Sequence, residues 1–314
     1  MDALDRQLKN PWTDLLTLFV LLLLCTIGIQ FFLLVAAWAF GKDLVDLMRT
    51  VSENTGEVNY FSYLVLASGS LGTFLLPAYF FYQRRTDVNF LTKDSLTGWR
   101  AYGGPVLFLF ALAPIMNLIG EWNMQMALPD SLGGVEEWMR RQEDNMAQLT
   151  SQIVMTKRWD RLLLNIIVIG FLPAICEEFF FRGALQNIFK RIVKSEVAAI
   201  WLVGFIFSLI HFQFYGFFPR LLLGVIFGYA VLWTKNIWTA VLAHFVNNTT
   251  VVLLAFYFAQ QGKGYDALME VDTYPIIMYL GSFVFSAMIG FVFYQYIKKE
   301  LYGKRLDKNS DLFK

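Results

Sequence analysis

The chain has 314 residues, of which 57% are hydrophobic and only 16% are charged, whereas soluble domains usually carry about 25% charged residues. This composition excludes an ordinary soluble domain. It predicts an all-α, polytopic membrane protein that forms one integral membrane domain over residues 1–314. The formal net charge is +1, and no basic stretch alternates with aromatic residues, so nothing indicates a nucleic-acid partner.

A series of apolar runs follows along the chain, and a transmembrane helix needs about 20 mostly apolar residues. The predicted spans are 15–40, 61–82, 102–119, 162 to about 181, 197–214, 221–233, 237–258 and 275–297. The first run is far longer than the roughly 7–15 residue core of a cleaved signal peptide. The run at 221–233 is short, and the aromatic stretch before it is typical of a membrane interface. About eight transmembrane helices are therefore expected.

Lysine and arginine indicate the orientation, because cytoplasmic loops carry an excess of them. If the N-terminus is inside, 16 of the 26 basic residues fall on the cytoplasmic side and nine on the other, with Arg182 left apart. This asymmetry predicts that both termini are cytoplasmic. We expect a multi-pass protein of a bacterial plasma membrane.

The one long loop lies between the third and fourth predicted spans, at 120–160. Within it, apolar or uncharged residues recur at helical spacing while charged residues fill the other face. The recurring residues are Val135, Trp138, Met139, Gln142, Met146, Leu149 and Ile153. The pattern predicts an amphipathic helix on the membrane surface. A lid over a substrate entrance is the alternative.

The fourth run ends in CEEFFFRGALQN, which places ionisable residues where lipid is expected. An intramembrane ionisable residue is by default a candidate functional residue. Glu178 and Arg182 are four residues apart, so they can pair on one helical face. Glu177 points about 100° away and has no use in such a pair. A purely structural ion pair therefore explains only part of the motif.

The two histidines of the chain, His211 and His244, both fall inside predicted spans. His244 and Asn248 are four residues apart and share a helix face. Pro173 lies four residues before Glu177, where it removes a backbone hydrogen bond and can open carbonyl groups near the site.

These side chains suffice for a hydrolase in lipid. Such an enzyme needs a base for water, a group that holds the water or protonates the leaving group, and donors for the oxyanion. Glu177, His211, and His244 with Asn248 could fill these roles in that order.

Helix depth raises a difficulty. At about 1.5 Å per residue, Glu177 lies roughly 24 Å below Arg161, whereas His244 lies roughly 13 Å above Lys235. Either the segment 183–196 dips into the membrane, or the helices tilt and start at different levels.

Three motifs carry a resemblance to a known family. EEFFFR has two glutamates, three residues and an arginine, FSLIH has Phe207 and His211, and HFVNN has His244 and Asn248. Over about 160–260 the chain resembles the CPBP family, which comprises type II CAAX prenyl proteases and the Abi bacteriocin-processing and immunity proteins. The resemblance implies a CAAX-protease-like fold and an intramembrane endopeptidase acting on a membrane-associated or lipidated protein or peptide.

The resemblance also implies roles. Glu177 would activate water together with His211, His244 and Asn248 would form the oxyanion hole, and Glu178 and Arg182 would support the site. No cofactor is favoured, although zinc held by Glu177, His211 and His244 is an alternative. The usual helical HExxH arrangement is absent from the sequence.

Two functions from other classes remain open. One is a non-catalytic immunity or scaffold protein that keeps the motifs for structure. The other is a transporter, although transporters tend to show inverted repeats and broken helices in both halves, whereas here the polar motifs all lie in the second half. The expected partners are membrane lipids and a membrane-associated substrate, with no soluble cofactor.

Overall fold

The computed structural model describes residues 10–39, 60–84, 95–269 and 273–311, with side chains as far as Leu301. Every regular element in these ranges is a helix, which confirms the predicted all-α class. The α-helices are α2 (Pro11–Ala39), α4 (Tyr60–Ser70), α5 (Leu76–Arg84), α6 (Trp99–Met124), α7 (Gly133–Val154), α8 (Trp159–Asn165), α9 (Leu172–Glu178), α10 (Gln186–Val193), α11 (Glu196–Leu209), α12 (Phe217–Thr234), α13 (Ile237–Gln260), α14 (Tyr265–Met269) and α15 (Ile276–Asp311).

Short helices of other types interrupt or join these elements. Three π-helical segments, η1 (Leu71–Leu75), η3 (Ile166–Phe171) and η4 (Phe179–Leu185), lie inside longer continuous helices. Two 3₁₀ segments, η2 (Asp130–Leu132) and η5 (Phe214–Gly216), precede α7 and α12.

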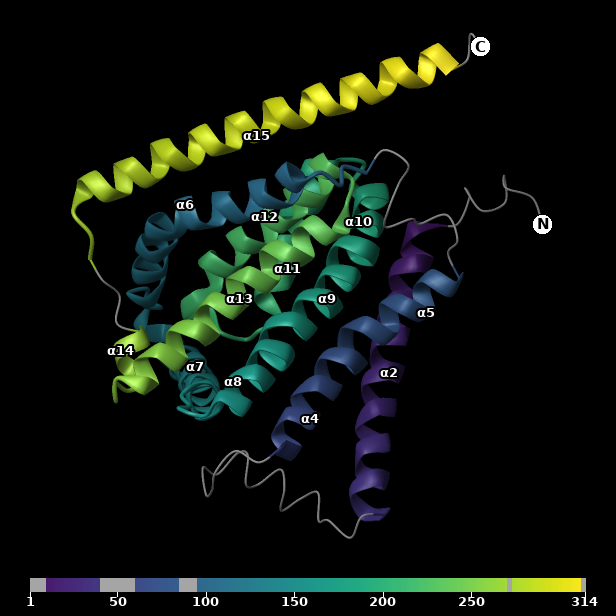
Figure 1. Cartoon of the computed structure of the whole chain (residues 1–314). Coiled ribbons are helices and arrows are strands. Elements are labelled where there is room, and N and C mark those ends of the chain that lie inside the picture. Colours follow the sequence, from purple (N-terminus) through teal and green to yellow (C-terminus); the bar gives the residue numbers. More distant parts are fainter. Residues whose placement is uncertain (1–9, 40–59, 85–94, 270–272, 312–314) are drawn as a thin grey trace.

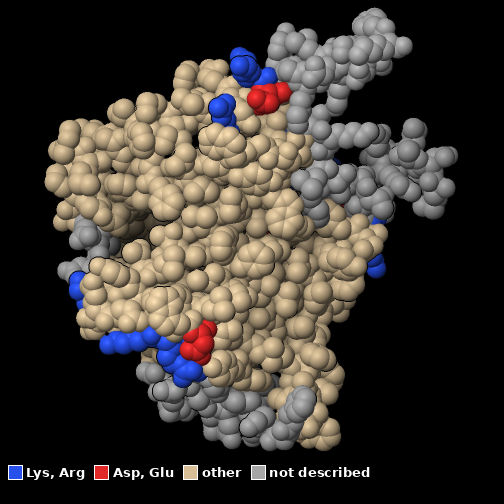
Figure 2. Space-filling model, in the orientation of Figure 1, with Lys and Arg blue, Asp and Glu red and all other residues tan. Residues whose placement is uncertain are grey.

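Seven helices in the described ranges are long and apolar enough to cross a membrane. They are Pro11–Ala39, Tyr60–Arg84, Trp99–Met124, Trp159–Val193, Phe214–Thr234, Ile237–Gln260 and Ile276–Leu301. The eighth predicted span corresponds to α11, an apolar helix of 14 residues. On the face in Figure 2, charged side chains lie near the top, at the lower left and at the two side edges, with a broad uncharged belt across the middle. Such a belt suits a multi-pass membrane protein.

The central helices surround the candidate site, and the terminal ones lie outside them. α9, α11, α12 and α13 lie together in Figure 1, whereas α2, α4 and α5 form a group on one side. Along the outer surface, α15 packs against α6. The largest cluster of buried apolar side chains joins the α2 group to the centre through Leu18, Phe81, Phe181, Ile188 and Val203. Close packing, rather than expulsion of water, holds such helices together in lipid.

The predicted end of the fourth span, near residue 181, lies too early in the chain. The helix does not stop near 181 but continues through η4 and α10 to Val193. Arg182 resembles the end of a span in the sequence, yet its side chain is buried inside the protein. Glu177 therefore lies about 24 Å from the end of the helix at Val193, near the middle of a helix of 35 residues. This longer helix removes much of the depth difficulty.

Two further boundaries differ from the prediction. The fifth span was expected to include His211, but α11 ends at Leu209, and Phe212 has a left-handed backbone with φ of 52°. The sixth begins earlier than expected, because η5 and α12 take in most of the aromatic stretch. His211 consequently lies in a loop just beyond a helix end. Within 120–160, the predicted amphipathic helix is confirmed as α7.

The orientation can be tested with two exposed positions, Asn145 on α7 and Glu300 on α15. Three long spans and the short α11 lie between them, and Glu300 is next to the last residue of a fourth span, Ile276–Leu301. If α11 and the loop after it complete a crossing, the two positions lie on opposite faces. We expect Asn145→Cys and Glu300→Cys, each in a background lacking Cys25 and Cys176, to react with an impermeant thiol reagent from opposite sides, Glu300→Cys from the cytoplasm.

Permeabilised membranes, in which both variants should react, provide the control. Labelling of both positions from the same side in intact membranes would show that α11 does not complete a crossing, and the eight-span topology would be wrong.

Candidate active site

A buried network of three side chains forms the centre of the site. Oε1 of Glu178 accepts hydrogen bonds from Nη1 of Arg182 and from Nδ1 of His244, both at 2.8 Å. The three residues are 0%, 2% and 4% exposed. Because a carboxylate can only accept, Nδ1 of His244 carries the hydrogen of this bond. The free ring atom, Nε2, is therefore turned away from Glu178.

Arg182 links this network to α12. Its Nη2 donates to the carbonyl oxygen of Gly224 at 2.8 Å, and its guanidinium lies over the ring of Phe207 at 4.9 Å. A Cβ on Gly224 would stand 2.9 Å from the Cα of Gly204 and 3.4 Å from Nη2. Only glycine allows α11 and α12 to approach closely enough for this bond.

Glu177 lies on the other side of His244. Its Oε2 is 3.9 Å from Nε2 of His244, and the residue is 9% exposed. The resemblance implies that Glu177 and His211 act together on a water, and no direct hydrogen bond between described residues joins the two side chains. The two adjacent glutamates thus approach opposite nitrogens of one imidazole. The ion pair predicted between Glu178 and Arg182 is confirmed.

His211 is fixed by the last turn of α11. Its Nδ1 lies 2.7 Å from the carbonyl oxygen of Phe207. A carbonyl oxygen accepts, so Nδ1 carries the hydrogen, and Nε2 of the neutral ring is an acceptor. The Phe207 ring lies 5.1 Å from the His211 ring and 6.0 Å from that of His244. Phe207 therefore packs against the rings of both histidines.

Asn248 meets the backbone of the helix that carries Glu177. Its Nδ2 donates to the carbonyl oxygen of Ile169 at 3.2 Å. Ile169 is four residues before Pro173, which has no N–H to complete the α-helical bond to that carbonyl. The carbonyl opened by the proline is thus satisfied by Asn248. This amide has a second N–H, which takes no part in the bond to Ile169.

The glutamates lie between two π-helical segments. Residues of η3 precede α9, and η4 begins directly after Glu178. Such segments are frequent at functional sites because they change the direction of neighbouring side chains. Pro173 was the one sequence feature that pointed to an irregular backbone here. The π-helical character of FFFRGAL had no recognisable signal.

Two residues of α12 were missed by sequence reasoning. Phe227 stacks on the ring of His244 at 4.9 Å with an interplanar angle of 16°, and Gly224 accepts from Arg182. Gly224 and Gly228 are four residues apart, a small-residue spacing typical of close helix packing. That spacing could have indicated a contact surface, although not its partner.

Zinc would require Glu177, His211 and His244 to converge at about 2.0–2.2 Å from one point. Among the described residues, no group of three or more His, Cys, Asp or Glu side chains could hold a metal ion. Nδ1 of His244 is already bonded to Glu178, which leaves Nε2 as its only possible ligand atom. A zinc site would therefore need these side chains to move.

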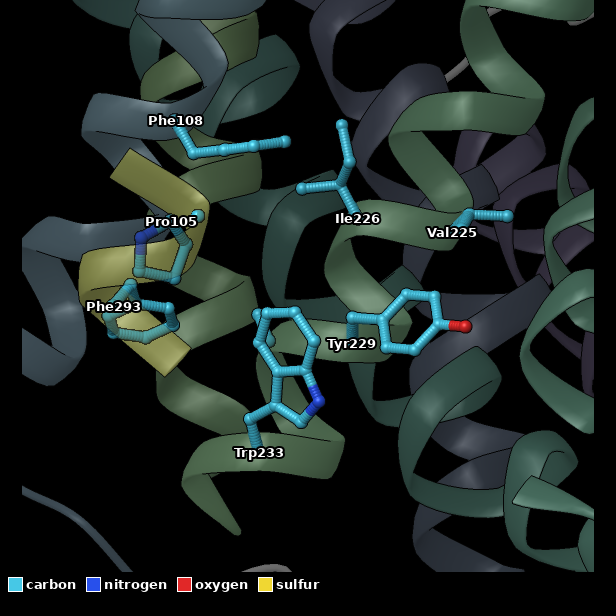
Figure 3. A pocket seen from close by; sticks show the side chains of 9 residues that line it. Pro105, Phe108, Val225, Ile226, Tyr229, Trp233 and Phe293 are labelled. Carbon is cyan, nitrogen blue, oxygen red and sulfur yellow. The ribbon is translucent and has the colours of Figure 1, made fainter. Parts of the chain in front are cut away.

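A separate apolar cavity of about 220 Å³ lies between α6, α12 and α15 (Figure 3). Phe108, Tyr229, Trp233 and Phe293 are among its lining side chains, and none of the ionisable residues of the candidate site lines it. The cavity shares α12 with the site but is distinct from it.

Comparison with known families identifies the segment that carries the site. Residues 159–250 match the model of the type II CAAX prenyl endopeptidase Rce1-like family. Searches against curated proteins and against solved structures each found no match. The matched segment contains all three motifs and confirms the resemblance stated from them.

The buried network generates a prediction for stability. Glu178→Gln keeps the size of the side chain but leaves Arg182 without its counter-charge. Removing one partner of a buried pair costs on the order of 3–5 kcal/mol. We expect a clearly lower melting temperature and folded yield in detergent. Glu137→Gln, which breaks the exposed pair with Arg141, should leave both unchanged. Equal melting temperatures for the two variants would contradict a stabilising role of the network.

Proposed function

Residues 159–250 belong to the type II CAAX prenyl endopeptidase Rce1-like family, and from this premise we propose that the chain is an intramembrane endopeptidase. It hydrolyses a peptide bond of a membrane-associated or lipidated protein or peptide. Glu177 activates the water. The observation that supports this best is the position of Glu177, 3.9 Å from the free nitrogen of His244 and outside the ion pair that Glu178 and Arg182 complete.

In the first step, Glu177 takes a proton from water as the water oxygen attacks the carbonyl carbon. His211 holds the water through Nε2, the acceptor left by the bond from Nδ1 to Phe207. A positioned general base contributes about 10²–10⁴-fold to a rate. In the second step, the carbon–nitrogen bond breaks, and the proton on Glu177 passes to the leaving amine. Atoms and charges balance without a further reactant.

The oxyanion is stabilised by His244 and Asn248. Nδ1 of His244 is hydrogen-bonded to the buried Glu178 carboxylate, and in the proposed step Nε2–H of the imidazolium donates to the oxyanion. Asn248 contributes the N–H that Ile169 does not use. One such donor is worth about 10²–10³-fold in kcat.

The general base is tested with Glu177→Gln, which keeps size and hydrogen bonding but removes the base. Turnover of a cleavable peptide in liposomes should fall by about 10²–10⁴-fold, with the melting temperature close to wild type. Comparative proteomics of membrane fractions from wild-type and Glu177→Ala strains would identify the substrate as a protein that is cleaved only in the wild type. A folded Glu177→Gln protein that cleaves at the wild-type rate would favour the alternative, a non-catalytic immunity or scaffold protein.

The two roles of Asn248 can be separated. Asn248→Ala removes the proposed oxyanion donor and also the hydrogen bond to the Ile169 carbonyl, so both kcat and melting temperature should fall. Adding Pro173→Ala supplies a backbone N–H four residues after Ile169. The double variant should regain stability while kcat stays about 10²–10³-fold low. Recovery of both quantities would show that Asn248 acts only through the backbone.

Metal independence is the remaining part of the proposal. We expect the purified protein to hold less than stoichiometric zinc and cleavage to survive chelation, because the mechanism uses only side chains and water. Elemental analysis and activity after chelation are the measurements. Stoichiometric zinc, with activity lost to a chelator and restored by zinc, would reverse the preference and assign Glu177, His211 and His244 as ligands.

A further inference from the structure

A single carboxylate on α7 binds the loop that follows His211. Glu143 accepts the backbone N–H of Tyr215 at 3.2 Å and the side-chain amide of Gln213 at 3.4 Å. Its Oε1 is also 4.0 Å from Nη2 of Arg220. From the sequence we expected only the apolar face of this helix to make contacts, with the membrane surface, and assigned no contact to Glu143.

The loop depends on side chains for its path. After α11 ends, Phe212 adopts a left-handed backbone, and the chain turns before η5. Arg220 donates to the carbonyl oxygen of Gln213 at 2.8 Å, and Asn123 of α6 donates to that of Phe214 at 3.0 Å. The next α-helix, α12, begins only at Phe217. We expect a segment held mainly by such side-chain contacts to open more easily when one of them is removed.

Aromatic contacts place α7 directly against the same loop. The rings of Trp138 and Phe214 lie 5.5 Å apart, and the guanidinium of Arg140 lies 4.4 Å from the centre of the Tyr215 ring. The face of α7 predicted to lie on the membrane surface thus includes a residue that packs on the protein. All of the loop residues that α7 contacts lie two to four positions after His211 in the chain.

The setting of Glu143 strengthens its polar contacts. The side chain is partly buried, and burial raises the pKa of the carboxyl above its usual range, against the opposing effects of the Tyr215 N–H and Arg220. Asp144 and Tyr265 also lie within its electrostatic reach. Hydrogen bonds to a charged group in such surroundings contribute more than exposed ones do.

We propose that Glu143 is a positioning residue for His211. By tying α7 to the segment Gln213–Gly216, it holds the end of α11 so that Nε2 of His211 faces the reacting water. The inference rests on the proposed function, because it assigns Glu143 a purpose within the same site. Glu143 does not contact substrate, so its removal affects turnover and leaves substrate binding unchanged.

Three variants test this role. Glu143→Ala removes both hydrogen bonds, and Glu143→Gln keeps an oxygen that accepts the Tyr215 N–H while losing the charge. The matched control is Glu137→Ala on the same helix, which breaks only an exposed pair with Arg141. Steady-state cleavage in liposomes gives kcat and KM. Hydrogen exchange of peptides that cover 211–218 reports whether the loop is held, independently of activity.

We expect Glu143→Ala to lower kcat by roughly 10- to 100-fold, since a misplacement of about 1 Å can cost that much, with KM changed by less than about twofold. Exchange in 211–218 should become faster. Glu143→Gln should recover most of kcat and most of the protection, and Glu137→Ala should match the wild type in both.

Other results overturn the inference. A raised KM at unchanged kcat would make Glu143 a substrate contact, and unchanged exchange in Glu143→Ala would show that it does not hold the loop. The same loss in Glu137→Ala would indicate a general effect on α7. A wild-type protein that cleaves no substrate would defeat the proposed function and this inference together, whereas an active wild type with an equally active Glu143→Ala defeats the inference alone.

Discussion

Burial of the Glu178 carboxylate in a membrane interior constrains everything around it. A charge taken out of water needs a partner and hydrogen bonds, and a buried pair that loses one member is strongly destabilised. Oε1 of Glu178 meets this need twice, through Arg182 and through His244. Arg182 in turn requires the carbonyl of Gly224. The network thereby fixes the register between the long fourth span, α12 and α13.

The backbone is subject to the same rule. Irregular helix within a membrane persists only where the freed polar groups find partners inside the protein. The carbonyl of Ile169, opened by Pro173, finds Asn248 on α13. Asn248, which the family resemblance suggests as an oxyanion donor, therefore also stabilises the backbone at Ile169. The two purposes are compatible because an amide has two N–H groups.

The sequence predicts the class and most of the architecture, since apolar runs of sufficient length have few alternatives in lipid. It also predicts the pair of Glu178 and Arg182, because a spacing of four residues lies within one helix. It fails at the ends of spans, where a polar residue such as Arg182 suggests exposure to water although the protein itself buries it. The bond from Glu178 to His244 joins residues 66 positions apart, and no local pattern encodes it.

The adjacent glutamates differ because their surroundings differ. Glu178 is fully buried and its Oε1 accepts two hydrogen bonds, whereas Oε2 of Glu177 lies 3.9 Å from Nε2 of His244, beyond hydrogen-bond distance. In the proposed mechanism, Glu177 acts as the base and also as the counter-ion of a protonated His244. Since Arg182 already neutralises Glu178, the imidazolium has no net counter-charge once Glu177 is protonated, which favours return of a proton to the leaving group. The proposed hydrolytic cycle therefore requires no change in the buried network of Glu178, Arg182 and His244.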